Sequence, residues 1–158
     1  MRIGRLCAGT LICGLAVSGC QNPDELPTAS APNTLSQAYG DPAAELVAKY
    51  RVGDNLRTIA AKMAWASQTA KMVSAQKLES ALDKLELKYR PAWDRALATC
   101  YAEQLNNEDL ESVLELGKES EAYPRLLRAQ SDVSKCMHST ASSIPQEMAV
   151  EALTEAYN

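Results

Sequence analysis

After residue 20, the side chains suited to thiol, imidazole or metal chemistry are Cys100, Cys136 and His138. A metal site needs several such ligands at short spacing, and the sequence has no second histidine and no cysteine cluster. A Cys136–His138 catalytic dyad is unfavourable because residues two apart on a helix do not face each other. No Gly-x-Ser-x-Gly elbow or glycine-rich phosphate loop is present. The sequence therefore predicts a protein that is not an enzyme and that needs no cofactor or metal.

A further cysteine, Cys20, ends the run Val17-Ser18-Gly19-Cys20, which closes a short apolar segment with a basic start. That segment is shorter and more interrupted than the roughly 20 apolar residues of a membrane-spanning helix. The layout resembles the lipobox of bacterial lipoproteins, with Val17 where leucine is commoner. The alternatives are an ordinary cleaved signal peptide or a transmembrane helix.

The lipobox resemblance implies a location. Residues 1–19 would be removed as a signal peptide, and Cys20 would become a lipidated N-terminus. Gln21, rather than aspartate, follows the cysteine, which by resemblance to the sorting rule of enteric bacteria implies the outer membrane. We therefore expect a lipid-anchored protein on the periplasmic side of the outer membrane.

The composition after the signal segment indicates which partners are unfavourable and where the chain is disordered. Removing Arg2 and Arg5 from 16 Lys+Arg leaves 14 basic side chains beside 20 acidic ones, a net charge of −6. Such an acidic chain does not favour nucleic acid or anionic lipid headgroups as partners. Residues 20–40 contain three prolines among small polar residues and are predicted to be a disordered, flexible tether.

Residues 41–158 are rich in helix-forming residues and show apolar side chains at helical spacing. They predict one all-α domain, a small bundle of five to seven helices. Capping residues, prolines and glycines divide it into the segments 42–50, 54–73, 74–90, 93–104, 106–117, 120–140 and 145–157. Pro91 is expected to break or kink the helix that precedes it.

Cys100 and Cys136 are predicted to form a structural disulfide, since the compartment beyond the inner membrane is oxidising. Their positions differ by 36, a loop for which chain entropy gives about 3 to 4 kcal/mol of stabilisation. The alternatives are two buried free thiols or a redox pair, and the absence of a Cys-x-x-Cys motif argues against the redox pair.

One short stretch, residues 101–110, carries a family resemblance. Leu105, Asn106, Asp109 and Leu110 follow the order of the central motif in a family of helical periplasmic proteins of unknown function, with Asn106 in place of a capping threonine. The resemblance extends over residues 101–145, although the family's Phe-Tyr pair and Pro-x-Gly turn are missing here. It implies an all-helical periplasmic fold and carries over no catalytic residue.

Acidic side chains gather in the same part of the sequence and form a candidate surface for a protein partner. Such a surface would attract a basic partner over long range, while the alternative is a solvated face whose first-turn acids stabilise helices. The candidate partner-binding residues are Glu103, Glu108, Asp109, Glu111 and Glu115.

These features favour a lipid-anchored, periplasm-facing helical protein that acts by protein–protein binding. An immunity or inhibitor protein against a periplasmic toxin is one such role. The alternative is a structural or regulatory envelope lipoprotein without an enzyme target. The sequence does not identify the partner.

Overall fold

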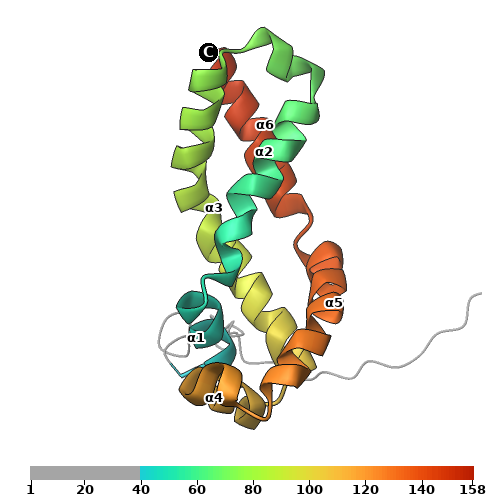
Figure 1. Cartoon of the computed structure of the whole chain (residues 1–158). Coiled ribbons are helices and arrows are strands. Elements are labelled where there is room, and N and C mark those ends of the chain that lie inside the picture. The colour runs from blue at the N-terminus through green and yellow to red at the C-terminus, as the bar shows by residue number, and fades with distance from the viewer. Residues whose placement is uncertain (1–39) are drawn as a thin grey trace, which may run out of the picture. The chain divides into compact units, whose positions relative to one another are not determined.

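The computed structural model describes residues 40–158, which contain six α-helices, three short 3₁₀ helices and no strand (Figure 1). This confirms the all-α prediction and the expected number of helices. The predicted signal peptide, Cys20 and all but the last residue of the predicted tether lie outside the described residues. The elements are α1 Pro42–Lys49, η1 Val52–Asn55, α2 Leu56–Ala66, η2 Gln68–Met72, α3 Ala75–Gln104, α4 Asn107–Leu116, η3 Gly117–Glu119, α5 Tyr123–Thr140 and α6 Ser143–Tyr157.

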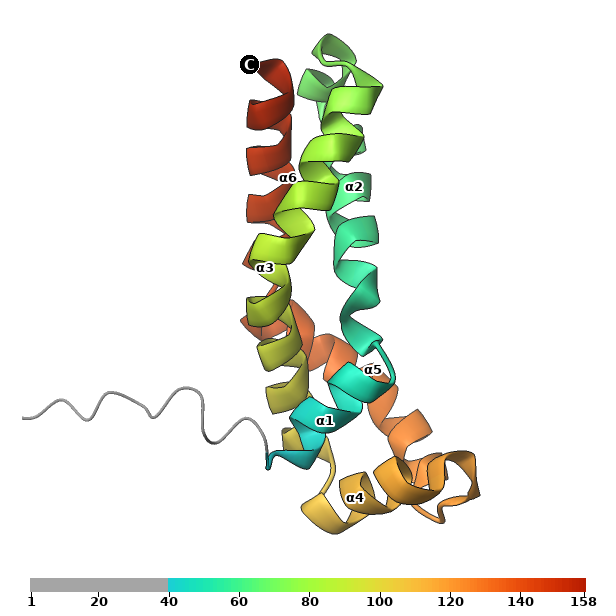
Figure 2. The ribbon, with the colours of Figure 1, turned by 90° about the vertical axis from the view of Figure 1, so that its left-hand side faces the viewer.

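The longest helix, α3, organises the fold. Its 30 residues span about 45 Å at the rise of an α-helix. The first half of α3 lies beside α2 and α6, and the second half lies beside α1 and α5 (Figures 1 and 2). Helix α4 packs against α1 at the end of the fold far from the C-terminus (Figure 2). No helix between residues 40 and 158 is both long and apolar enough to cross a lipid bilayer.

The predicted break at Pro91 is wrong, because α3 continues through it as one helix. Proline has no N–H to donate to the carbonyl of Leu87, one turn earlier. Pro91 and Leu87 are both exposed, so water can hydrate that carbonyl. The missing bond therefore costs less here than it would on a buried face.

Two predicted helix starts are confirmed. The Asp41 side chain accepts a hydrogen bond from the Ala43 N–H at 2.9 Å, and Pro42 occupies the first turn of α1. The Asn106 side chain accepts from the Asp109 N–H at 2.8 Å and begins α4. Both caps satisfy N–H groups that the first helical turn leaves unpaired.

Two other predicted starts are wrong. Asp54 does not cap α2, which begins at Leu56; its carboxylate instead pairs with Arg90 on α3 at 2.6 Å. Helix α5 begins at Tyr123 rather than at Ser120. The Ser120 side chain is buried and accepts from the N–H two residues later, which fixes the turn before α5.

Most of the predicted apolar stripes face the core, which is built largely from leucine and alanine. Six of the residues on the predicted stripes do not, namely Met63, Ala66, Gln104, Leu127, Gln130 and Thr140. Met63 on α2 is 44% exposed and Leu127 on α5 is 54% exposed. Met63 borders one surface cavity and Leu127 borders another.

Candidate functional site

Helix α4 carries most of the predicted acidic surface, and α1 holds its C-terminal end in place. The hydroxyl of Tyr50 donates to the carbonyl of Val113 at 3.0 Å, and the Lys49 ammonium donates to the carbonyl of Leu114. The Lys49 bond satisfies a carbonyl that the last turn of a helix leaves open. Tyr50 adds a second donor to the Val113 carbonyl, which already accepts from the N–H of Gly117. Gly117 then ends α4 with φ of +60°, a conformation that L side chains rarely adopt.

Three acidic side chains of α4 form an exposed row. Glu108, Glu111 and Glu115 are three and four residues apart, so they lie on one helix face. The opposite face packs into the core. No ion pair joins any of the three to another residue between positions 40 and 158. Their charges are therefore presented to solvent.

The other two predicted partner-binding residues lie differently. Both carboxylate oxygens of Asp109 accept from Arg125, at 2.9 Å from Nε and 2.5 Å from Nη2, and this side chain is only 14% exposed. Asp109 therefore ties α4 to α5 and is not free to meet a partner. Glu103 is exposed but belongs to α3, where one of its oxygens lies 3.4 Å from the sulfur of Cys136.

The predicted disulfide is present and joins α3 to α5. The sulfurs of Cys100 and Cys136 are 1.99 Å apart and their Cα atoms are 5.8 Å apart. Cys100 is fully buried, whereas Cys136 is partly exposed. The pairing leaves neither residue as the free thiol of the alternative interpretation.

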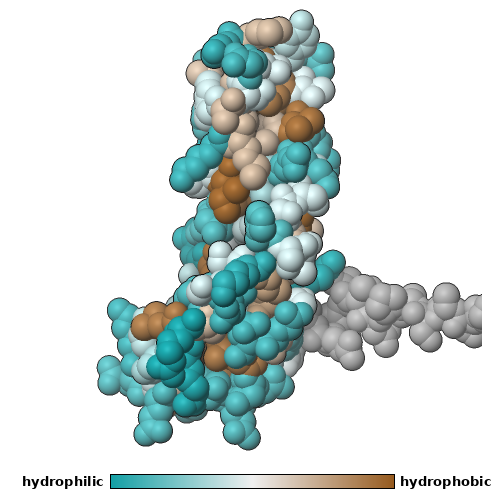
Figure 3. Space-filling model, turned by 90° about the vertical axis from the view of Figure 1, so that its right-hand side faces the viewer, coloured by the Kyte–Doolittle hydropathy of each residue, from teal (hydrophilic) through white to brown (hydrophobic). Residues whose placement is uncertain are grey.

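The acidic charge is concentrated around α4. Residues 103–121 hold seven of the 20 acidic side chains and one of the 14 basic side chains that follow residue 19, a net charge of −6. The remaining residues after position 19 contain 13 of each sign and balance. The net charge expected after signal removal thus belongs to one segment. The lower part of Figure 3, where α4, η3 and the start of α5 lie, is mostly hydrophilic with separate hydrophobic areas.

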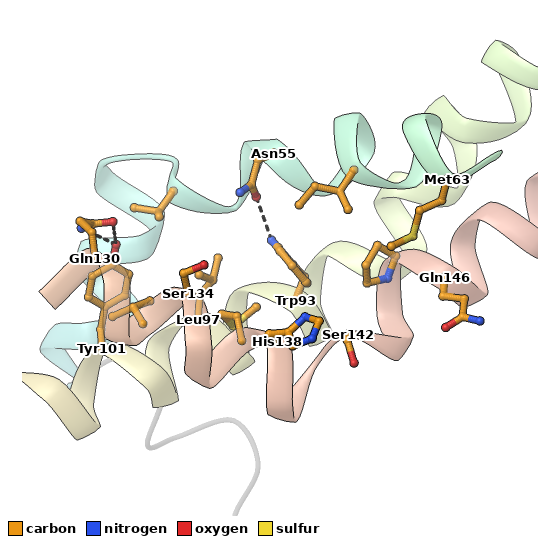
Figure 4. A pocket seen from close by; sticks show the side chains of 15 residues that line it. Asn55, Met63, Trp93, Leu97, Tyr101, Gln130, Ser134, His138, Ser142 and Gln146 are labelled. Carbon is orange, nitrogen blue, oxygen red and sulfur yellow. Dashed lines mark hydrogen bonds between the residues drawn. The ribbon is translucent and has the colours of Figure 1, made fainter. Parts of the chain in front are cut away.

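A cavity of about 520 Å³ lies between α2 and α5, with α3 as its floor (Figure 4). We call it the groove. Two of its polar side chains are held in place: the Trp93 indole donates to the Asn55 side chain at 3.2 Å, and the Gln130 side-chain amide donates to the Tyr101 hydroxyl at 3.0 Å. The groove is lined by Val52, Asn55, Ile59, Met63, Trp93, Leu97, Tyr101, Gln130, Val133, Ser134, Met137, His138, Ser142, Pro145 and Gln146.

A second cavity, of about 370 Å³, continues the groove toward α4. The two cavities share Val52, Tyr101 and Gln130. The second is also bordered by Tyr50, whose hydroxyl reaches the end of α4, and by Lys118 of η3. The apolar groove therefore leads to the acidic segment.

Sequence reasoning missed the groove. Helical periodicity placed its residues on inward faces but gave no sign that α2 and α5 leave a gap between them. One signal was available: Gln130, Ser134 and His138 recur every four residues beside the apolar stripe of α5. His138, for which the sequence predicted no site, lines the groove.

The groove adjoins one buried carboxyl group without a hydrogen-bond partner. Oδ1 of Asp94 is buried and pairs with no other described residue. Burial raises the pKa of Asp94, while the nearby Arg90 opposes that rise. The carboxyl packs on the backbone of Gly53, where an added Cβ would lie 1.8 Å from Oδ1. A side chain at position 53 would therefore displace the Asp94 carboxyl from its present place.

Within residues 40–158, no three histidine, cysteine, aspartate or glutamate side chains are grouped so that they would hold a metal ion. Comparison of the chain with protein-family models, with curated proteins and with solved structures gave no match. The resemblances to lipoproteins and to a helical periplasmic family stay predictions. The candidate site therefore rests on its own geometry: an acidic row on α4 that an apolar groove approaches.

Proposed function

We propose that this is a lipid-anchored, periplasm-facing helical protein that binds a basic protein partner through the acidic row of α4. The observation that carries the proposal is the charge distribution, since the segment 103–121 holds the whole net charge of −6 expected after signal removal. A charge spread evenly over the surface would serve solubility alone, whereas one concentrated in a single segment creates a directional field.

The row is suited to capture by long-range attraction. Glu108, Glu111 and Glu115 are exposed and have no basic partner between residues 40 and 158, so their field is not neutralised locally. Electrostatic steering mainly raises the association rate, and it weakens as salt shortens the screening length to about 8 Å at physiological ionic strength. An inhibitor that must meet its target quickly gains from such steering.

Anchoring supports the same role. A chain attached through Cys20 would hold the acidic row in the periplasm near the outer membrane. A toxin that arrives in the periplasm is one target that an anchored immunity or inhibitor protein would block there. The alternative, a structural or regulatory envelope lipoprotein, uses the same anchor but does not require a concentrated charge.

The binding surface is tested by charge reversal with a matched control. The test variant carries Glu111→Lys and Glu115→Lys, and the control carries Glu45→Lys and Glu147→Lys, two exposed acids outside the segment. Both variants change the net charge equally. Proteins crosslinked to each variant in intact cells are identified, and association rates of the purified partner are measured at two salt concentrations.

We expect the test variant to associate roughly tenfold more slowly at low salt and the control to behave like the wild type. Circular dichroism should show the same helix content in all three proteins. A partner that binds both variants equally fast, with no dependence on salt, would refute the proposal.

The anchor is tested separately with Cys20→Ser. This variant should lose membrane attachment or stay unprocessed, as judged by fractionation and by the mass of the N-terminal peptide. A processed variant that still requires detergent for release would disprove lipidation at Cys20. Density separation of the two membranes then tests the outer-membrane location.

A further inference from the structure

Apart from the imidazole of His138, the groove is lined by uncharged side chains. None of its fifteen lining residues is Asp, Glu, Lys or Arg, although these types make up 23% of the chain. A charged ligand group would lose its hydration here without gaining an ionic partner, which is unfavourable. The part of any occupant that lies in the groove is therefore uncharged.

One side of the groove carries a regular polar row. Its members come from α5, from the turn that follows and from the start of α6, and Figure 4 shows them one after another along the cavity. The polar row is Gln130, Ser134, His138, Ser142 and Gln146, with a constant spacing of four residues. The opposite wall is mostly apolar, with Val52, Ile59 and Met63, and the floor is formed by Trp93, Leu97 and Tyr101.

The spacing of the polar row fits an extended peptide. Four residues of an α-helix rise about 6 Å, and two residues of an extended chain rise about 6.6 to 6.8 Å. Main-chain groups of every second peptide residue would therefore meet Gln130, Ser134 and His138, the members of the row that lie in α5. Alternate peptide side chains would face the apolar floor. A helical ligand would satisfy its own main chain and leave the row unused.

We propose that the groove binds an extended, uncharged and partly apolar segment of a protein partner, with basic residues next to that segment at the α4 end. The basic residues follow from charge complementarity, because the second cavity leads from the groove to the acidic segment. Lys118 is the one base that lines this second cavity, and the basic residues would lie beyond it, over Glu111 and Glu115. This inference rests on the proposed function and names the kind of segment that the partner presents.

The probe is a phage-displayed library of random twelve-residue peptides, selected on the full chain held in lipid nanodiscs. We expect enriched peptides to alternate apolar with small or polar uncharged residues and to carry Lys or Arg at one end. Enrichment of apolar residues at three- and four-residue spacing would show a helical occupant and overturn the extended geometry. Failure to enrich any sequence, or occupation of the groove by lipid in native mass spectrometry, would overturn the peptide site.

Substitutions at one exposed position then separate groove binding from surface charge. Ser134→Glu and Ser134→Lys place opposite charges in the groove, and both should weaken the best synthetic peptide by roughly tenfold, because either charge faces an uncharged segment. Ser131→Glu and Ser131→Lys lie on the same helix, exposed and outside the lining, and should change affinity by less than about twofold. Fluorescence anisotropy of the labelled peptide gives the dissociation constants.

The two proposals fail in different ways. Binding that weakens in the Glu111 and Glu115 reversals but not in the Ser134 variants would refute the groove as a binding site and support the acidic surface. Binding that weakens only in the Ser134 variants would support the groove and refute the acidic surface as a binding site. An effect of Ser134→Lys without an effect of Ser134→Glu would show simple repulsion of a basic ligand and would overturn the groove inference.

Discussion

The two halves of α3 belong to regions that are held together differently. The three-helix region comprises α2, α6 and residues 75–90 of α3, whereas the crossed region comprises α1, α4, α5 and residues 91–104 (Figures 1 and 2). Alanines fill much of the first core, namely Ala60, Ala64, Ala81, Ala149, Ala152 and Ala156. The crossed region also buries alanines, among them Ala43 and Ala98, but adds the large side chains of Trp93 and Tyr101 and the disulfide.

The two regions also differ in how their helices are joined. Small side chains at a helix contact allow the helix axes to approach closely. In the three-helix region, the ion pair Arg57–Glu79 joins α2 to α3, and Lys84–Glu155 joins α3 to α6. Larger side chains hold helices further apart, and α4 and α5 diverge from the axis of α3 (Figure 2). Cavities border both regions, and the groove runs along their junction, between α2 and α5. The disulfide adds to the crossed region a covalent bond between helices that the three-helix region does not have.

The largest expected effect is loss of the disulfide. Replacing Cys100 and Cys136 together with alanine should lower the free energy of unfolding by about 3 to 4 kcal/mol, because the loop of 36 residues regains its freedom in the unfolded chain. Urea denaturation measures the change. Hydrogen exchange sharpens the comparison: α4 and α5 should lose protection before α2 and α6 do. Equal loss in all helices would show that the two regions unfold as one unit.

A smaller effect is expected where the two regions meet. Gly53→Ala would place a Cβ 1.8 Å from the Asp94 carboxylate, so the Asp94 side chain must rotate away or η1 and α3 must move apart, at a cost of about 1 to 3 kcal/mol. Asp94→Ala should restore most of that loss in the double variant, and thermal unfolding of the four proteins completes the cycle. A Gly53→Ala variant as stable as the wild type would show that the contact is loose.

How far the sequence predicts this structure depends on the range of the interaction. The caps at Asp41 and Asn106 were predictable because a cap is set by one side chain and an N–H two or three residues away. The disulfide was predictable because only two cysteines follow Cys20. Continuity through Pro91 was not, since it depends on whether Leu87 faces water.

The candidate site was predictable only in part. Acidic spacing along α4 placed Glu108, Glu111 and Glu115 on one face from sequence alone. The pairing of Asp109 with Arg125 depends on how α5 returns past α4, which no local pattern encodes. The groove likewise depends on the distance that the fold leaves between α2 and α5. Helical periodicity shows which side chains share a helix face, but it does not show whether another helix packs on that face.

The third prediction concerns pH and the same junction. Burial raises the pKa of Asp94 above its ordinary value of 3.8, against the attraction of Arg90. The folded chain therefore holds this proton to a higher pH than the unfolded chain, so this group's contribution to stability is lost as the pH rises through the folded-state pKa. Asp94→Asn cannot ionise, and it should gain on the order of 1 kcal/mol over the wild type between about pH 3 and pH 7.

Chemical denaturation of both proteins across that range gives the difference curve for Asp94→Asn. Because other carboxylates titrate in both proteins alike, their effects cancel. A flat difference curve would mean that water reaches Oδ1 and that the junction between the two regions is hydrated.

The smallest effect is expected from an ion pair of the three-helix region. The guanidinium of Arg57 donates to Glu79 and to Asp83, at 2.6 Å each, and lowers the pKa of Glu79 with help from the Trp65 indole. A carboxyl whose pKa is lowered by folding stabilises the fold above its unfolded value of 4.5, and this contribution is lost as the pH falls, the opposite sign to Asp94.

Arg57→Gln should therefore destabilise by less than about 1 kcal/mol at pH 7, because these side chains are 31% to 66% exposed and water screens them. The loss should shrink further at pH 3 and in high salt, measured by urea denaturation beside the disulfide variant. A loss as large as that of the disulfide would reverse the comparison, since the three-helix region would then depend on its charged rim rather than on its alanine core.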